Sequence, residues 1–282
     1  MPFAERPQER TGLSEQEVRE VRSLIEQCLP VDVNIILEAS AGQQFLHYQA
    51  DTLAGVLGVR HDGEACLCVA PGARRRGIGR ALISAADAHL ARAGIREMVV
   101  ECDASSREGQ AFSSAMGGTA SYAEFRLRLS DPKALPVSAG KVHLEAVGPE
   151  EMAAFAGASA VSFGQPLEAK ISEFSGQVGT ARYRFYRGRA LGDVVAGICA
   201  AFHGAETHLT GFHTLPEARR RGYGRDLLLQ TCRTLIAEGR TEIILEVRTD
   251  NEAALGLYWS CGFELVRRYD FYTRRVVSGS QR

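Results

Sequence analysis

The chain has 282 residues, of which 45% are hydrophobic, and its 33 basic and 34 acidic side chains leave a net charge of −1. This length suits two domains of ordinary size, each able to bury a core. The near-neutral charge gives no field that would attract nucleic acid or an anionic membrane. No run of 18 apolar residues is present to span a bilayer. We therefore expect neither nucleic acid nor a membrane as a partner.

The first residues, MPFAERPQER, are charged and lack the apolar core of a secretory signal. The seven cysteines are an odd number and lie mostly in apolar stretches, as reduced thiols do. Cys66 and Cys68 have no second pair of Cys or His nearby, so they do not predict a metal site. We expect a cytoplasmic protein without a metal. The sequence does not indicate its oligomeric state.

In the first half, Ser14 and Glu17 have the spacing of a capping box, which predicts a helix over about 15–29. Strands and helices then alternate. The predicted strands are TLAGVLGV, EACLCVA, EMVVEC and ASYAEFRLRL, with helices at about 75–92 and 106–116. The stretch SDPKALPVSAG, 130–140, has two prolines and no periodicity, which is typical of a linker.

The second half shows the same alternation. Its predicted elements are strands at about 193–202 and 206–214, an amphipathic helix between Pro216 and Gly239, the strand TEIILEV, a short helix and the strand FELVRRYDFY. Asp250 or Asn251 is expected to cap the short helix, and Gly262 is expected to end it. Strands alternating with helices predict an α/β fold with a mixed sheet.

One heptapeptide occurs twice, as RRRGIGR at 74–80 and RRRGYGR at 219–225. The two copies lie 145 positions apart, and the same offset aligns further residues without a gap: Pro71 with Pro216, Leu82 with Leu227, Gly94 with Gly239, Glu101 with Glu246, and Gly117 with Gly262. The chain is therefore predicted to be a tandem repeat of one domain. We expect domains at 1–130 and 141–282, joined by a linker at 131–140.

The repeated heptapeptide lies between a predicted strand and a predicted helix. The backbone N–H groups of the first helical turn have no intrahelical partner, and the helix dipole adds partial positive charge there. Two glycines allow an anion to approach the backbone closely, and the arginines add charge. These features predict a pyrophosphate site. Neither copy has the Lys-Ser/Thr of the Walker loop or the three glycines of the dinucleotide fingerprint.

The spacing R/Q-x-x-G-x-G/A, after a strand and a proline, resembles the acetyl-CoA motif of the GNAT superfamily of N-acetyltransferases. A second family signature lies in EVRTDNEAALGLYWSCGF, where the matching residues are Asn251, Ala254, Tyr258, Gly262 and Phe263. The resemblance covers nearly all of 142–273 and, more weakly, about 45–127. It implies two tandem GNAT-like domains, each a mixed, mostly antiparallel sheet flanked by helices, in a duplication like that of mycothiol synthases.

The resemblance also implies acetyl-CoA as the cosubstrate and an amine of a small molecule or peptide as the acceptor. In domain 2 the residues expected to bind acetyl-CoA are Phe212, Thr214, Arg219, Arg220, Arg221, Gly222, Tyr223, Gly224, Arg225 and Asn251. In domain 1 they are Arg74, Arg75, Arg76, Gly77, Gly79 and Arg80.

Family chemistry is direct attack of a neutral amine on the thioester, which needs a base and an acid. Tyr258 matches the family tyrosine that protonates the departing thiolate, and a phenol keeps its proton at neutral pH. The alternative is an aromatic residue packed beside Trp259. In some family members the catalytic glutamate lies ten residues before the strand-end proline, and in others it lies fourteen residues before the first motif glycine. Glu206 occupies the first of these positions and His208 the second, so the resemblance makes both of them candidates for the base. They share one strand face, and an ordinary polar strand end explains them equally well.

Domain 1 departs from the family pattern. At the 145-residue offset, Tyr258 falls on Ser113, Asn251 on Ser106 and His208 on Gly63. We expect domain 1 to be non-catalytic. Whether it still binds CoA or only buries part of domain 2 stays open.

Two other functions fit parts of the sequence. A regulatory acyl-CoA-binding protein without turnover would not need Tyr258. A tandem aminoacyltransferase that uses aminoacyl-tRNA would not need two intact phosphate loops, and the near-neutral charge offers no tRNA footprint. The sequence therefore predicts an acyl-CoA N-acyltransferase that works in its carboxyl-terminal domain. Residues 150–180, where acceptor specificity is expected, carry no motif that identifies the amine.

Overall fold

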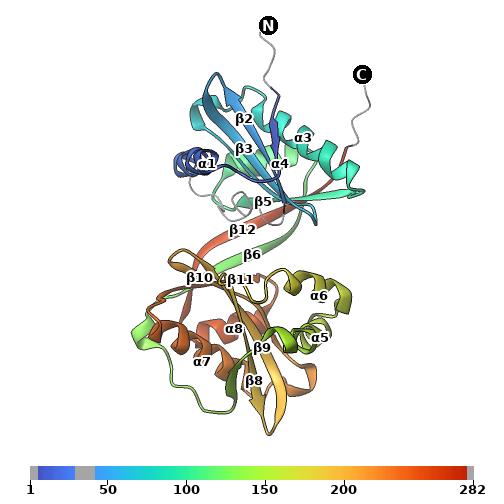
Figure 1. Cartoon of the computed structure of the whole chain (residues 1–282). Helices are drawn as coiled ribbons and strands as arrows, with labels where there is room; N and C mark the ends of the chain where they lie inside the picture. Colours follow the sequence, from blue (N-terminus) through green and yellow to red (C-terminus); the bar gives the residue numbers. More distant parts are fainter. Residues whose placement is uncertain (1–5, 29–41, 278–282) are drawn as a thin grey trace. The chain divides into compact units, whose positions relative to one another are not determined.

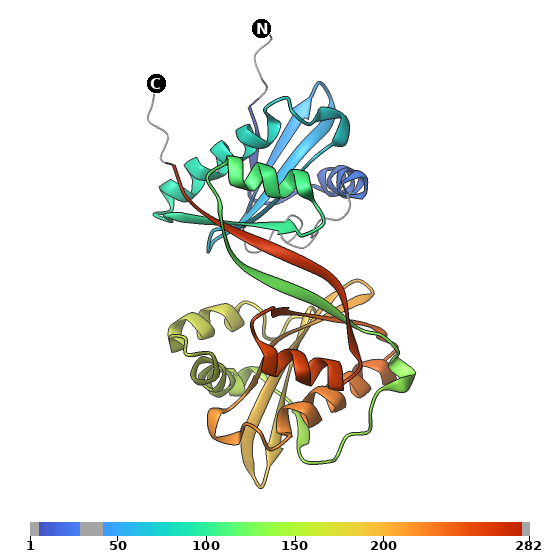
Figure 2. The same cartoon turned by 180° about the vertical axis from the view of Figure 1, so that it is seen from behind.

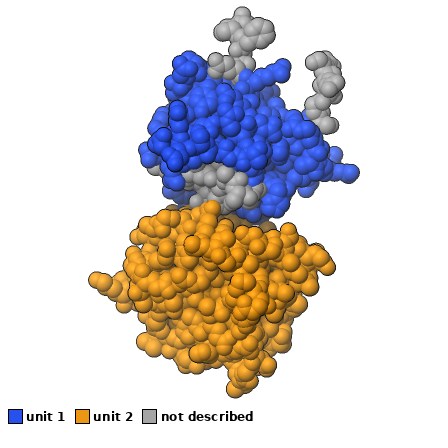
Figure 3. Space-filling model, in the orientation of Figure 1, with its two compact units in different colours: residues 1–123, 267–282 blue, residues 124–266 orange. Residues whose placement is uncertain are grey.

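The structure, a computed structural model, describes residues 6–28 and 42–277 (Figure 1). It divides the chain into two compact units (Figure 3). Unit 1 consists of Met1–Ala123 and Arg267–Arg282, and unit 2 is Glu124–Val266. Each unit is a mixed, mostly antiparallel sheet with helices, which confirms the predicted fold class.

The sheet of unit 1 has the strand order β1-β2-β3-β4-β5-β12. Only β4 and β5 run parallel; the other neighbours are antiparallel. The strands are β1 (Gln8–Arg10), β2 (Gly42–Gln49), β3 (Thr52–Arg60), β4 (Glu64–Val69), β5 (Glu97–Asp103) and β12 (Phe263–Arg275). The helices are α1 (Glu15–Gln27), α3 (Ile78–Arg92) and α4 (Arg107–Ala115), and the 3₁₀ turn η2 (Pro71–Ala73) precedes α3.

Unit 2 has the strand order β6-β11-β10-β9-β8-β7, and only β10 and β11 run parallel. The strands are β6 (Thr119–Leu129), β7 (His143–Ala146), β8 (Tyr183–Ala190), β9 (Asp193–His203), β10 (Glu206–Thr214) and β11 (Glu242–Arg248). The helices are α5 (Met152–Phe163), α6 (Leu167–Ser175), α7 (Tyr223–Ala237) and α8 (Glu252–Ser260), with 3₁₀ turns η3 (Pro132–Ala134), η4 (Pro149–Glu151) and η5 (Pro216–Ala218). Strands β7 and β8 and helices α5 and α6 had no predicted counterpart.

Helices cover both faces of the unit 2 sheet. Successive side chains of a strand point to opposite faces, and apolar side chains occur on both. On one face α7 and α8 pack on the sheet, and their core includes Leu227, Cys232, Leu255 and Leu245. On the other face α5 and α6 form an aromatic cluster of Phe155, Phe174 and Phe185 around Cys199. In unit 1, α3 and α1 cover opposite faces in the same way.

Local sequence signals set several helix ends. Ser14 and Glu17 form the predicted capping box, so α1 begins as expected; residue 29, the predicted end, lies outside the described residues. Asn251 caps α8 by accepting a hydrogen bond from the Ala254 N–H at 3.2 Å. Helices α3 and α7 begin later than predicted, because Arg75 (φ 64°) and Gly77 (φ 88°) have left-handed backbones that cannot continue a helix.

The last strand of each repeat pairs with the other repeat. Strand β6 follows α4 of unit 1, yet its second half pairs with β11 of unit 2, with Arg126 opposite Glu246. Strand β12 follows α8 of unit 2, and its second half, Tyr269 to Arg275, pairs with β5 of unit 1. Both strands can be followed from one unit into the other in Figure 2. The compact units therefore differ from the predicted division at 130 and 141, since pairing across repeats leaves no trace in local periodicity.

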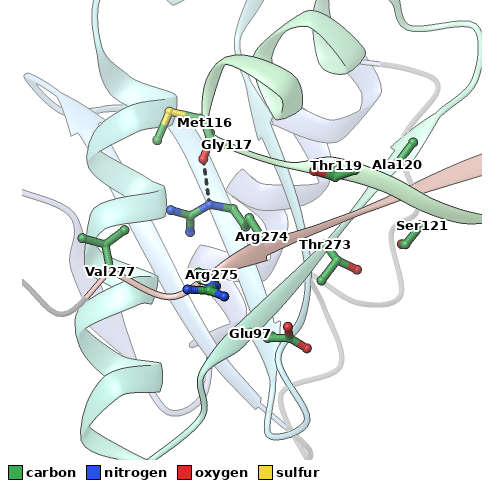
Figure 4. Close-up of a pocket in the computed structure, with 10 residues that line it drawn as sticks. All are labelled: Glu97, Met116, Gly117, Thr119, Ala120, Ser121, Thr273, Arg274, Arg275 and Val277. Carbon is green, nitrogen blue, oxygen red and sulfur yellow. Dashed lines mark hydrogen bonds between the residues drawn. The ribbon is translucent and has the colours of Figure 1, made fainter.

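A buried ion pair fastens β12 in unit 1. The Arg274 guanidinium donates to Asp87 on α3 through Nη1 to Oδ1 at 2.6 Å and Nη2 to Oδ2 at 3.1 Å. Its Nε donates to the carbonyl of Met116 at 2.9 Å (Figure 4). Both charged side chains are buried. Loss of one partner of such a pair leaves the other charge buried without a counter-ion.

We expect Arg274→Ala to lower the free energy of unfolding by about 3–5 kcal/mol, the usual loss when one partner of a buried pair is removed. Urea denaturation of the full chain measures this change. The neighbouring Arg275 is exposed, so Arg275→Ala is the matched control and should stay within about 0.5 kcal/mol of the native protein. Equal effects of the two substitutions would contradict the fastening role.

Candidate active site

The two parallel strands of unit 2 separate part-way along their length. Glu206 to Leu209 of β10 pair with Glu242 to Leu245 of β11, and the pairing stops there. A bulge between Thr210 and His213, with Gly211 at φ 59°, turns β10 away, although β10 still pairs with β9. Such bulges often lie beside functional sites. The edge of β10 that faced β11 is open from Thr210 onward, and the first residue of β11 beyond the pairing is Glu246.

The heptapeptide loop lies at the end of this opening, between η5 and α7. Arg220 (φ 64°) and Gly222 (φ 84°) have left-handed backbones, and α7 begins at Tyr223. Unit 1 repeats this conformation at Arg75 and Gly77. The first-turn N–H groups of both helices lack intrahelical partners and carry the positive end of the dipole. Both loops thus have the backbone of an anion site.

Two of the loop arginines are tied to the protein itself. The Arg219 Nε donates to the carbonyl of Thr214 at 3.1 Å, and its Nη2 donates to the carbonyl of Ser162 at 2.9 Å. Arg225 donates to the carbonyl of Ser260 at 3.3 Å. Arg220 and Arg221 are exposed at the tip of the loop. The exposed pair is therefore better placed to meet an incoming anion than Arg219 or Arg225.

Lys141 adds a positive charge at the same loop. Its Nζ donates to the carbonyl of Arg221 at 2.9 Å. Asp226 on α7 holds this segment by accepting the N–H groups of Ala139 at 2.7 Å and Val142 at 3.0 Å. Lys141 begins the predicted second domain, and no local pattern in the sequence links it to a loop so far along the chain. Only the fold reveals it.

Gly224 is required by packing as well as by any ligand. A Cβ at this position would lie 2.6 Å from Thr214 Oγ1 and 3.3 Å from the Phe212 ring. The structure thus brings Gly224, Phe212 and Thr214 together, as predicted for one site. A larger side chain at Gly224 would push α7 off β10, so its substitution is not a clean test of ligand binding.

Tyr258 lies on α8 and is 7% exposed. Its ring packs near Phe212 and Phe263, with centroid distances of 6.0 and 6.1 Å. Trp259, considered from the sequence as its packing partner, is instead 54% exposed. Burial, followed by the nearby Cys261, raises the pKa of Tyr258. The phenol therefore keeps its proton at neutral pH and can act as an acid.

The candidate bases lie on the opposite face of the sheet. The Arg126 Nη2 on β6 lies 2.7 Å from Glu206 Oε1, and its Nη1 lies 3.4 Å from Glu246 Oε1. His208 Nε2 lies 3.7 Å from Glu246 Oε2. Burial, then the charges of Arg126 and His203, lowers the pKa of His208 to about 3. His208 is therefore neutral at physiological pH but only weakly basic.

In unit 1 the positions that correspond to Tyr258 and His208 carry other residues, whereas Glu101 occupies the position of Glu246. Ser113 occupies the position of Tyr258 and is buried, and Gly63 sits in the turn before β4 with φ 93°. Ser106 caps α4, as Asn251 caps α8. The strands β4 and β5 pair only at Glu64 and Ala65 with Val99 and Val100.

The hollow drawn in Figure 4 is also in unit 1. Residues from β5, β6 and the end of β12 line it, among them Glu97, Ser121 and Arg275. None of the residues expected to bind acetyl-CoA or to take part in catalysis belongs to its lining. It has no part in the candidate site.

Comparison with known proteins decides the family. The sequence model of the acetyltransferase (GNAT) family matches residues 11–117 and 158–263, which together exceed half of the chain. The chain belongs to the GNAT family. It is a GNAT acetyltransferase with two family segments, and the family implies an acyl-CoA cosubstrate.

Individual relatives agree with this assignment. The N-alpha-acetyltransferase RimI of Mycobacterium tuberculosis is 45% identical over 84 residues, which cover 26% of this chain and 49% of that protein. This chain thus matches about half of that relative's length.

Solved structures show the same architecture along nearly the whole chain. A GCN5-related N-acetyltransferase from Sphaerobacter thermophilus has a TM-score of 0.74 with 15% identity, and 96% of each chain is covered. A tandem GNAT protein from the clavulanic acid biosynthesis pathway has a TM-score of 0.73 with 19% identity, covering 98% of this chain and 99% of its own. The tandem arrangement predicted from the repeat is confirmed.

The site of this GNAT acetyltransferase contains residues that the sequence did not single out. Glu246 carries no signal in the sequence beyond its match to Glu101 in the repeat, and Arg126 and Lys141 carry none. Across residues 6–28 and 42–277, no helix is long and apolar enough to cross a membrane. In the same part of the chain, no three His, Cys, Asp or Glu side chains are grouped as metal ligands would be.

The duplicated loops offer a test of which unit binds the cosubstrate. Arg221 and Arg76 occupy equivalent exposed positions. Reversing the charge in Arg221→Glu removes an attraction of about 0.2–1 kcal/mol and adds a similar repulsion. We expect the Kd for acetyl-CoA, measured by calorimetry, to rise about tenfold. Arg76→Glu is the matched control: an unchanged Kd and stoichiometry would assign binding to unit 2 alone. A rise only in the Arg76 variant would contradict this expectation.

Proposed function

We propose that this acetyltransferase transfers an acetyl group from acetyl-CoA to a primary amine of a small molecule or peptide, and that the reaction takes place in unit 2. The observation that supports this most directly is the opening between β10 and β11. It joins the anion loop at α7 to Tyr258 on one sheet face and to the carboxylates on the other. At the matching described positions of unit 1, Ser113 stands in place of Tyr258 and Gly63 in place of His208.

In this proposal the pyrophosphate lies on the backbone of residues 220–225, near Arg220, Arg221 and Lys141. The open edge of β10 offers N–H and C=O groups to the amides of the cosubstrate, as an unpaired strand edge does. Phe212 and Thr214 lie along this edge. Asn251 acts by capping α8, which fixes the helix that carries Tyr258.

The chemical step uses both faces of the sheet. The neutral amine attacks the thioester carbonyl from the carboxylate face, forming the C–N bond. The C–S bond then breaks, and Tyr258 gives its proton to the departing thiolate. The proton that the new amide nitrogen releases passes through solvent to restore the phenol. Because Leu245 points into the core with α7 and α8, the next residue, Glu246, points to the opposite face. In this proposal the acid, Tyr258, and the base therefore approach the thioester from opposite faces of the sheet.

Three groups near the opening could accept the ammonium proton. His208 is a weak base because its pKa is about 3. Glu206 is held by Arg126 at 2.7 Å. Glu246 has longer contacts, at 3.4 Å to Arg126 and 3.7 Å to His208, and it stands where the strands separate. We therefore assign proton removal to Glu246, with Glu206 and His208 lining the approach of the amine.

We expect Tyr258→Phe to lower kcat by about 10²–10⁴-fold, the usual contribution of a general acid. The Kd for acetyl-CoA should change less than about twofold, because the ring still packs near Phe212 and Phe263. The lost interaction belongs to the transition state. A panel of amines provides the acceptor, and pre-steady-state kinetics measures the chemical step apart from product release. Tyr272→Phe, at a buried tyrosine of unit 1, is the control. A native rate of acetyl transfer in the Tyr258 variant would reduce Tyr258 to a packing residue.

Two isosteric variants distinguish the role of Glu246 from that of Glu206. We expect Glu246→Gln to lower kcat/KM by about 10²-fold or more, because it removes the proposed base. Glu206→Gln should cost clearly less. The full pH profile of kcat/KM for both variants is the measurement. A larger loss in the Glu206 variant would move the base to Glu206, and equal small losses would remove both carboxylates from proton transfer.

A further inference from the structure

Arg126 is placed in unit 2 by β6, the strand that follows α4 of unit 1. Its guanidinium reaches across β11 and touches carboxylates on two different strands, Glu206 on β10 and Glu246 on β11. The arginine side chain is 15% exposed. A guanidinium that pairs with two carboxylates in a half-buried setting is fixed more firmly than an exposed single pair.

Two of the contacts of Glu246 are to charged or titratable side chains. Its Oε1 faces Arg126 at 3.4 Å, and its Oε2 faces His208 at 3.7 Å. Arg126 is itself anchored by the shorter contact to Glu206. The chain of contacts therefore runs from Glu206 through Arg126 to Glu246, and it fixes the direction in which the last carboxylate presents its oxygen to the opening between β10 and β11.

The comparison of the two units supports a functional reason for this arginine. The exchanged strands occupy equivalent positions: Arg126 lies opposite Glu246 in unit 2, and Phe271 lies opposite Glu101 in unit 1. Phe271 stacks on Tyr122 with a centroid distance of 4.4 Å, an apolar contact. The duplicated fold thus accepts an aromatic residue at this position, so the sheet pairing alone does not require arginine.

We propose that Arg126 is the positioning residue of the acetyl-transfer site, and that it orients Glu246 toward the amine while Glu206 anchors the guanidinium. This inference rests on the proposed function of unit 2. It means that the site in the second unit is completed by a residue from the first repeat. Arg126 acts through Glu246 and does not need to touch the reacting atoms.

The charged and titratable groups around Arg126 come from its own strand and from three strands of unit 2. Strand β6 supplies Glu124 and Arg128, β10 supplies Glu206 and His208, β11 supplies Glu242 and Glu246, and the end of β9 supplies His203. After burial, the charge of Arg126 is the larger of the two positive influences that lower the pKa of His208. Removing its charge therefore raises the pKa of His208 and takes away a positive charge that favours the ionised form of the proposed base, Glu246.

The test compares Arg126→Met, Arg126→Lys and Arg128→Met in the full chain. Arg128 is two residues further along the same strand face, and it is 54% exposed with a 3.9 Å contact to Glu242, so it is the matched control. For Arg126→Met we expect the acid limb of the kcat/KM profile to move up by about one pH unit, with the KM for acetyl-CoA unchanged. Arg126→Lys should restore part of the shift, and Arg128→Met should show none.

A second readout does not depend on turnover. Histidine NMR titration measures the pKa of His208, whose resonance is assigned as the one lost in His208→Gln. We expect this pKa to be higher in Arg126→Met than in the native protein and unchanged in Arg128→Met. Urea denaturation confirms that each variant is folded; if Arg126→Met unfolds, Arg126→Lys and Arg126→Gln take its place. Unchanged His208 titration and an unchanged pH profile in the folded Arg126 variant would overturn the proposal.

The same two readouts separate this proposal from the proposed function. If the native protein acetylates no amine while the His208 titration still responds to Arg126, the proposed function fails, the electrostatic contact stands and the positioning role is rejected. If the native protein is active and the Arg126 variant keeps the native pH profile and kcat, only the positioning role is rejected.

Discussion

The buried pair of Arg274 and Asp87 holds two segments that lie 187 positions apart in the chain. It fastens β12 beside β5, and so unit 1 cannot complete its sheet until the last strand of the chain has been made. A guanidinium without its carboxylate would be an uncompensated charge in the core. Folding of the amino-terminal unit therefore depends on the carboxyl-terminal repeat, and the two halves cannot be treated as independent domains.

The reciprocal strand has a chemical consequence. Strand β6 gives unit 2 a partner for β11, and it also brings Arg126 to the carboxylates beside the opening between β10 and β11. Strand exchange between repeats is thus more than a way to close two sheets. It places a residue encoded by one repeat beside the candidate site of the other. In our proposal the first repeat thereby contributes to chemistry that takes place in unit 2.

The two repeats keep one backbone and differ in side chains. Both loops begin their helices after left-handed residues at Arg75 and Gly77 or at Arg220 and Gly222. An anion site made of backbone N–H groups tolerates many changes in the surrounding side chains. General acids and bases have no such tolerance, because proton transfer needs a particular group at a particular place. The loops could therefore stay alike while Tyr258 and Ser113 diverged.

The sequence by itself determined the repeat, the α/β class, the position of both glycine-containing loops before α3 and α7, and the helix starts at Ser14 and Asn251. These follow from local periodicity, glycine placement and capping chemistry, each readable within a few residues. Tertiary structure alone decided which β-strand completes which sheet, because β6 and β12 have suitable patterns for either partner. For the same reason the sequence did not predict the contacts of Arg126, Lys141 and Arg274. Each of these residues contacts residues far away in the chain, and local sequence patterns contain no information about such contacts.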